Sequence, residues 1–87
     1  MDVHSERSLK LVEVVWNDAW YDDNTSTRAD SIEHARPFRT CTIGYLVANE
    51  KAGVMLSRDF YPSTNEFKHR HFIPSEMMVS MRYLLGE

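Results

Sequence analysis

The sequence predicts an all-β protein: a small barrel of five short strands, with a long loop after the first strand and a single helical turn before the last. Three observations lead to this prediction. Apolar, β-branched and aromatic residues alternate with polar ones over five short segments. Short connections rich in Gly, Pro, Asn and Ser separate the later segments. Finally, Pro74 interrupts the chain between the fourth and fifth segments, which therefore cannot form a simple hairpin.

The first strand is predicted over residues 9–16. Its alternation places Val12, Val14 and Trp16 on one face, which we expect to form the core. Leu11 and Val15 make the opposite face apolar as well. We therefore expect that face to be covered by the following loop or by a neighbouring subunit.

A long connection follows over residues 17–38, near the upper limit for an ordered loop in a compact domain. Within it a short helix is predicted at 30–35, capped by Asp30 or Ser31 and ended by Pro37. Trp20 and Tyr21 are apolar enough to pin the loop back onto the barrel.

The remaining strands are predicted at 39–48, 54–61, 67–73 and 78–84. In the first of them Cys41 alternates with apolar residues, which predicts a small buried side chain, and Gly44 marks a bend or bulge. Gly53, in the connection that follows, is free to take a positive φ. After Ile73 and Pro74, Ser75 and Glu76 suit one helical or 3₁₀ turn.

Composition limits the possible functions. The 87 residues predict one domain over 1–87, with residues 1–8 flexible, and a core so small that we expect a homo-oligomer. The net charge of −3 argues against binding duplex nucleic acid. No apolar run approaches a membrane span, and a single cysteine forms no internal disulfide, so we expect a cytoplasmic protein with no membrane partner.

The best functional signal is a basic and aromatic group in the middle of the chain. Residues 39–71 carry a net charge of +2, against −4 for 1–38 and −1 for 72–87. Arginine and lysine bind phosphate, and aromatic rings stack on bases. The predicted ligand-binding residues are Arg58, Tyr61, Lys68, His69, Arg70, His71, Trp20 and Tyr21. The alternative is a solvated hairpin face, with Trp20 and Tyr21 covering the core beneath the loop.

Other site types have weaker support. His69 and His71 share a strand face and could bind a metal with Cys41 and His34, but the spacing of a structural zinc site is missing. The acidic loop lacks the pattern of a calcium-binding loop. Cys41 with a histidine is the only nucleophile and base pairing worth naming, and no phosphate loop occurs. We therefore expect no enzyme, no metal and no cofactor.

The strand pattern and the turn at Ile73-Pro74-Ser75 resemble the SH3-like and Sm-like small barrels. The acidic specificity loop and Ala-Leu-Tyr strand of SH3 domains are missing, so recognition of proline-rich peptides is not implied. Four segments, at 14–19, 42–47, 54–57 and 72–74 followed by Val79 and Leu84, resemble a group of small phage and prophage proteins. That resemblance implies a source and a fold but no activity.

Together these features predict a non-enzymatic, oligomeric phage protein in the cytoplasm of an infected bacterium. The leading hypothesis is a sponge that sequesters a host nucleotide immune signal, such as a cyclic oligonucleotide or an ADP-ribose-type molecule, between subunits. The first alternative is an interaction module that inhibits a host defence protein through Trp20, Tyr21 and the acidic loop. The second is weak binding of single-stranded nucleic acid on the barrel face.

Overall fold

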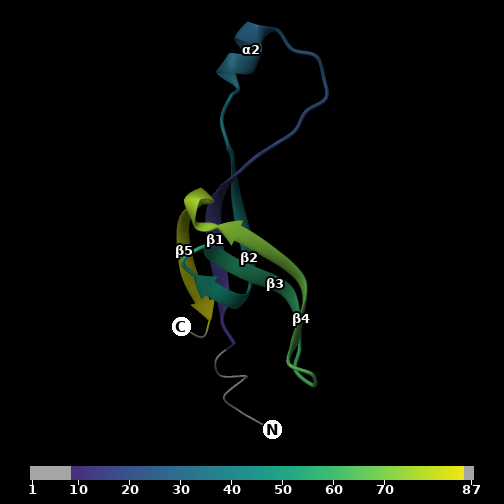
Figure 1. The fold of residues 1–87 in the computed structure, drawn as a ribbon, viewed down its shortest axis with the longest axis vertical. Coiled ribbons are helices and arrows are strands. Elements are labelled where there is room, and N and C mark those ends of the chain that lie inside the picture. The colour runs from purple at the N-terminus through teal and green to yellow at the C-terminus, as the bar shows by residue number, and fades with distance from the viewer. Residues whose placement is uncertain (1–8, 86–87) are drawn as a thin grey trace.

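The computed structural model describes residues 9–85 (Figure 1). The strands are β1 (Leu11–Asp18), β2 (Phe38–Glu50), β3 (Gly53–Tyr61), β4 (Glu66–Pro74) and β5 (Met78–Leu85). The helical elements are α2 (Arg28–Glu33) and the 3₁₀ turn η1 (Ser75–Met77). The predictions of an all-β chain, five strands and a helical turn before the last strand are confirmed. The flexible segment predicted at 1–8 lies outside the described residues.

All five strands form one antiparallel sheet in the order β4-β3-β2-β1-β5. Successive strands are neighbours except β5, which follows η1 and returns beside β1. Within residues 9–85 the outer strands β4 and β5 do not pair with each other. The five predicted strands therefore form one antiparallel sheet, but in this structure it remains open, and the predicted closed barrel is not confirmed.

The core is small and joins strands that are not neighbours in the sheet. Its buried members are Val12, Val14 and Trp16 from β1, Val54 and Leu56 from β3, and Ile73 from β4. Because β2 separates β1 from β3, these side chains can meet only if the sheet bends strongly. A register shift between Leu46 and Ala48 supplies an irregularity in β2 of the kind that bends sheets. The predicted core face of the first strand is confirmed, including Trp16.

The turn before β5 is tied to the turn between β2 and β3. The Ser75 hydroxyl lies 2.9 Å from the carbonyl oxygen of Lys51, and the Ser75 amide donates to Ala52 O at 3.0 Å. Gly53 pairs with Pro74 and has a φ of 154°, as predicted. A Cβ at Gly53 would lie 2.3 Å from the carbonyl oxygen of Ile73, so no larger residue fits there.

Residues 19–37, which we call the arm, project from one end of the sheet (Figure 1). The molecule is consequently elongated, with extents of 60 × 22 × 20 Å. Every residue of the arm is exposed, and Tyr21 is 87% exposed. The prediction that Trp20 and Tyr21 pin this loop onto the barrel is therefore wrong, because the arm turns away from the sheet.

The helix of the arm also differs from its predicted position. It starts at Arg28 and ends at Glu33, whereas the prediction placed it at 30–35. The capping residue is Thr27, whose hydroxyl accepts a hydrogen bond from the Asp30 amide at 3.2 Å. Threonine caps nearly as well as aspartate or serine, so the sequence contains several adjacent starting points.

Candidate functional site

The candidate site lies where β2 and β3 separate, a point that we call the fork. The two strands pair from Glu50 and Gly53 as far as Tyr45 and Ser57. Beyond that point β2 pairs only with β1, and β3 pairs only with β4. A hollow of about 220 Å³ lies at the fork, lined by Thr42, Ile43, Leu56, Ser57, Arg58, His69 and His71.

Gly44 and Ser57 hold the two strands together at the last point of pairing. A Cβ at Gly44 would lie 2.8 Å from the carbonyl oxygen of Ser57, so the close approach requires glycine. Of the predicted bend or bulge at Gly44, the bulge is wrong, because the register shift falls between Leu46 and Ala48 instead. Gly44 permits a close backbone contact, which is the other common role of a glycine within a strand.

The Ser57 hydroxyl contacts backbone carbonyls of both β3 and β4 where the pairing of these strands is interrupted. Ser57 is only 1% exposed, and its Oγ lies 2.7 Å from the carbonyl oxygen of Asp59 and 2.6 Å from that of Lys68. Its single proton can be donated to one carbonyl at a time. Since this hydroxyl is engaged with backbone carbonyls, Ser57 is a structural residue of the fork.

His69 has an unusual backbone conformation for a strand residue, with a φ of 61°. Its backbone therefore leaves the ladder, and no pairing joins His69 to Arg58 although their neighbours pair. The ring Nδ1 lies 2.7 Å from Asp59 Oδ2 and is the donor to this carboxylate. Non-glycine residues in this conformation are concentrated at functional sites, so the distortion supports the fork as a candidate functional site.

Electrostatics at the fork are mixed. The hydrogen bond from His69 lowers the pKa of Asp59, and the nearby charges of Arg58 and Lys68 act in the same direction. Arg58 Nε is 3.7 Å from the Asp59 carboxylate, and the Arg58 side chain is 75% exposed. Asp59 is therefore charged and already contacted by a cation and an imidazole, while the Arg58 guanidinium retains N–H groups for another acceptor.

His71 is anchored against the core. Its ring meets the Trp16 ring edge-on, with the centroids 5.2 Å apart and the planes at 78°. Trp16 Nε1 in turn donates to Thr42 Oγ1 at 2.9 Å, which connects β1 to the β2 side of the fork. These contacts fix one imidazole on a rigid part of the sheet, as a binding site requires.

The structure separates the predicted ligand-binding residues into three groups. Arg58, His69 and His71 line the hollow. Lys68 and Arg70 are exposed on the same β-hairpin, opposite Asp59 and Ser57, and Tyr61 ends β3 opposite Glu66. Trp20 and Tyr21 belong to the arm, at the other end of the molecule (Figure 1). A single chain therefore does not bring all eight together, and the predicted pocket between subunits stays a prediction.

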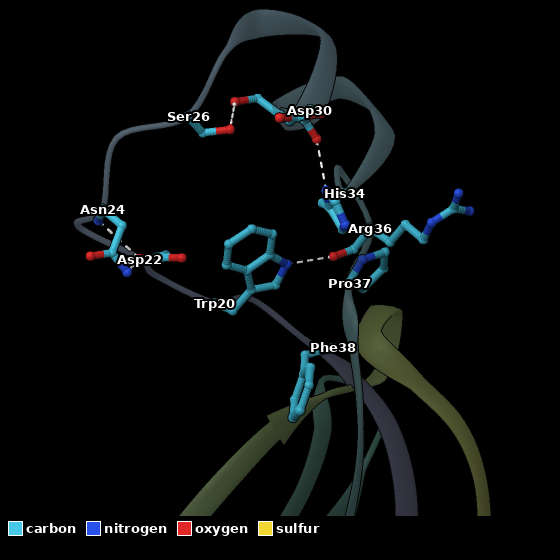
Figure 2. A pocket seen from close by; sticks show the side chains of 10 residues that line it. Trp20, Asp22, Asn24, Ser26, Asp30, His34, Arg36, Pro37 and Phe38 are labelled. Atoms are coloured by element: carbon cyan, nitrogen blue, oxygen red, sulfur yellow. Dashed lines mark hydrogen bonds between the residues drawn. The ribbon is translucent and has the colours of Figure 1, made fainter.

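A second and larger hollow, of about 590 Å³, lies within the arm (Figure 2). Trp20 crosses the arm, and its Nε1 donates to the carbonyl oxygen of Arg36 at 2.6 Å. Asp22 and Asp30 belong to the lining, together with the aromatic ring of Phe38. The lining also includes His34, whose Nδ1 lies 2.8 Å from the carbonyl oxygen of Asp30, and Arg36, whose side chain extends away from the hollow (Figure 2). Because the acidic side chains repel phosphate, this hollow suits an anion less well than the fork does.

The structure also bears on Cys41, on metal binding and on membrane-spanning segments. Cys41 is exposed, so the prediction of a buried side chain is wrong, and a hydrogen bond to Glu13 raises the pKa of its thiol. No group of three or more His, Cys, Asp or Glu side chains within residues 9–85 is arranged to hold a metal ion. Within the same range neither helical element has the length and apolar character that crossing a bilayer requires.

Sequence reasoning missed Thr42, Ser57 and Asp59 as parts of the fork. The polar run Ser57-Arg58-Asp59 interrupts an otherwise apolar strand, and this was the available signal. The comparisons with known proteins add no relative: the chain matches no protein-family model, no curated protein and no solved structure.

Proposed function

We propose that this protein is a non-enzymatic binding module that holds a small anionic ligand of the nucleotide class at the fork. The observation that supports the proposal best is the hollow lined by Arg58, His69 and His71 at a distorted point of the sheet. Guanidinium and imidazole groups donate hydrogen bonds to phosphate oxygens. The sheet positions them from two paired strands, so the donors need little reorganisation to bind.

The size of the hollow suits one phosphoryl group better than a whole nucleotide. Its volume of about 220 Å³ is below that of most pockets for drug-sized molecules, which are roughly 300–1,000 Å³. The base and sugar would therefore lie outside it, over the adjoining hairpin. The same hairpin exposes the side chains of Lys68, Arg70, Tyr61 and Phe72. Strand alternation places these on its other face from Leu56 and His71, so the ligand would reach them around the edge strand β4.

The role that we propose is sequestration of a host nucleotide signal by a phage protein, in the form of a cyclic oligonucleotide or an ADP-ribose-type molecule. Sequestration requires tight binding and no bond cleavage. This suits a small chain in which the buried hydroxyl of Ser57 is engaged by backbone carbonyls. The strand order and the 3₁₀ turn before β5 support placing the bent sheet in the SH3-like class of small folds.

The test is calorimetric titration of the purified protein with cyclic di- and trinucleotides and with ADP-ribose. Arg58→Ala should make the binding free energy less favourable by roughly 1.5–3 kcal/mol, as expected for loss of a charge-assisted bidentate contact. Arg58→Lys should have an intermediate effect. Lys51→Ala is the matched control, because Lys51 is an exposed cation at the β2–β3 turn, outside the fork. Recovery of intact ligand after denaturation supports sequestration, while recovery of altered ligand would make the protein an enzyme.

One observation favours a second candidate function, an interaction module that inhibits a host defence protein. Every residue of the arm is exposed, and Tyr21 and Ile32 are 87% and 69% exposed. Apolar side chains placed this way on a projecting segment are typical of protein contacts. If no nucleotide binds, and Tyr21→Ser with Ile32→Ser abolishes inhibition of a purified defence protein, this second function replaces the first.

A further inference from the structure

We propose that the arm of one copy docks on the basic hairpin of a second copy, so that two chains form a closed dimer with two identical contacts. The basic hairpin is defined here as residues 57–71, which include the far part of β3, its turn and most of β4. The inference rests on the proposed function and names the second copy as the partner that completes its site. Three independent features support it.

The first feature is the apolar surface that the arm leaves uncovered. Three large side chains of the arm are mostly exposed: Trp20 at 51%, Tyr21 at 87% and Ile32 at 69%. Phe38, which directly follows the arm, is 65% exposed. Within residues 9–85 the core contains six buried apolar side chains. Burying the apolar surface of the arm against another molecule would therefore add substantially to a weak folding unit.

The second feature is charge. The arm carries Asp22, Asp23, Asp30 and Glu33 against Arg28 and Arg36, a net charge of −2. The basic hairpin carries Arg58, Lys68 and Arg70 against Asp59 and Glu66, a net charge of +1 before its two histidines are counted. Opposite potentials on two surfaces of the same chain favour contact between copies and fix its orientation.

The third feature is the position of the two surfaces. The arm lies at one end of the 60 Å molecule, and the turn of the basic hairpin lies at the other (Figure 1). A two-fold axis across the long dimension therefore places each arm beside the basic hairpin of the other copy. Both contacts form at once and the assembly closes, whereas one-way docking would leave an arm and a hairpin unpaired at the ends of an open chain.

This arrangement reunites the residues that a single chain separates. Trp20 and Tyr21 of one copy would approach Arg58 and the neighbouring cations of the second copy. The Trp20 indole is held at its nitrogen by the carbonyl of Arg36, which leaves its faces able to stack on a base. A nucleotide would then contact cations from one copy and aromatic rings from the other.

Charge reversal tests the dimer directly. The arm variant carries Asp23→Lys and Glu33→Lys, the hairpin variant carries Lys68→Glu and Arg70→Glu, and all four positions are exposed. Each variant alone should self-associate at least about tenfold more weakly, because like charges then face each other. An equimolar mixture should regain the dimer as a heterodimer, since each arm now meets a hairpin of opposite charge. Glu50→Lys, outside both surfaces, is the control and should dimerise normally.

The readout is mass by light scattering, with the wild type expected at about 20 kDa against a chain mass of 10.2 kDa. A monomeric wild type, variants that dimerise normally, or a mixture that stays monomeric would overturn the inference. Its failure is distinguishable from that of the proposed function. A wild-type monomer that binds ADP-ribose removes only the dimer, and a dimer that obeys the charge-reversal pattern but binds no nucleotide removes only the ligand.

Discussion

Replacing His69 by glycine and by alanine should reveal the strained backbone at the fork. Both changes remove the imidazole and its 2.7 Å contact with Asp59, so that loss cancels when the two variants are compared. What remains is the backbone, held at a φ of 61°. Since this left-handed conformation costs an L-residue roughly 1–2 kcal/mol and glycine almost nothing, His69→Gly should be about 1 kcal/mol more stable than His69→Ala.

The assay is urea unfolding of both variants at one protein concentration, followed by circular dichroism. The sign of the difference is diagnostic, because in an ordinary strand the alanine variant is more stable than the glycine variant by roughly 0.5–1 kcal/mol. His71, an exposed residue of the same strand without a positive φ, provides the matched pair and should show that ordinary order. If His69→Ala proves as stable as His69→Gly, the distorted backbone at the fork is refuted.

Three further perturbations test the packing and charge around the fork. Ile73→Ala removes a fully buried core side chain and should lower the free energy of unfolding by about 2–4 kcal/mol, measured in urea; an unchanged midpoint would contradict the shared core. Gly44→Ala places a methyl 2.8 Å from a backbone oxygen and should cost about 1–3 kcal/mol, whereas a neutral result would mean that the strands approach less closely. The lowered pKa of Asp59 means that its ionised form stabilises the fold above about pH 4 and that this stabilisation fades as the pH falls below that value. The stability advantage of the wild type over Asp59→Asn should therefore shrink as the pH falls below about 4 in acid titrations; a constant difference would refute the contact between Asp59 and His69.

The strands could be predicted because their signal is local. Alternation over 9–16 identifies the buried face of β1, and the rigid φ of Pro74 ends β4 before η1 regardless of the rest of the fold. The helix in the arm was misplaced by two residues because Thr27, Asp30 and Ser31 all have capping side chains, and the choice among them depends on local geometry.

The site could be predicted only in part, because it depends on how strands separate. Basic and aromatic residue types identified Arg58, His69 and His71, but no local pattern shows that β2 and β3 part beyond Ser57. The positive φ of His69 is likewise a consequence of that separation. The arm was assigned to the core surface because Trp20 and Tyr21 are apolar, although apolar residues also occur on surfaces that bind partners.

The most direct test of the account is a nuclear magnetic resonance titration of ¹⁵N-labelled protein with ADP-ribose. If the fork holds the phosphoryl groups, the backbone amides of Ile43, Arg58 and His69 should shift together and saturably. The amides of Asn49 and Lys51, at the opposite end of the β2–β3 pairing, should remain unchanged. Saturable shifts confined to other parts of the chain, or no shift with any nucleotide of the panel, would contradict binding at the fork.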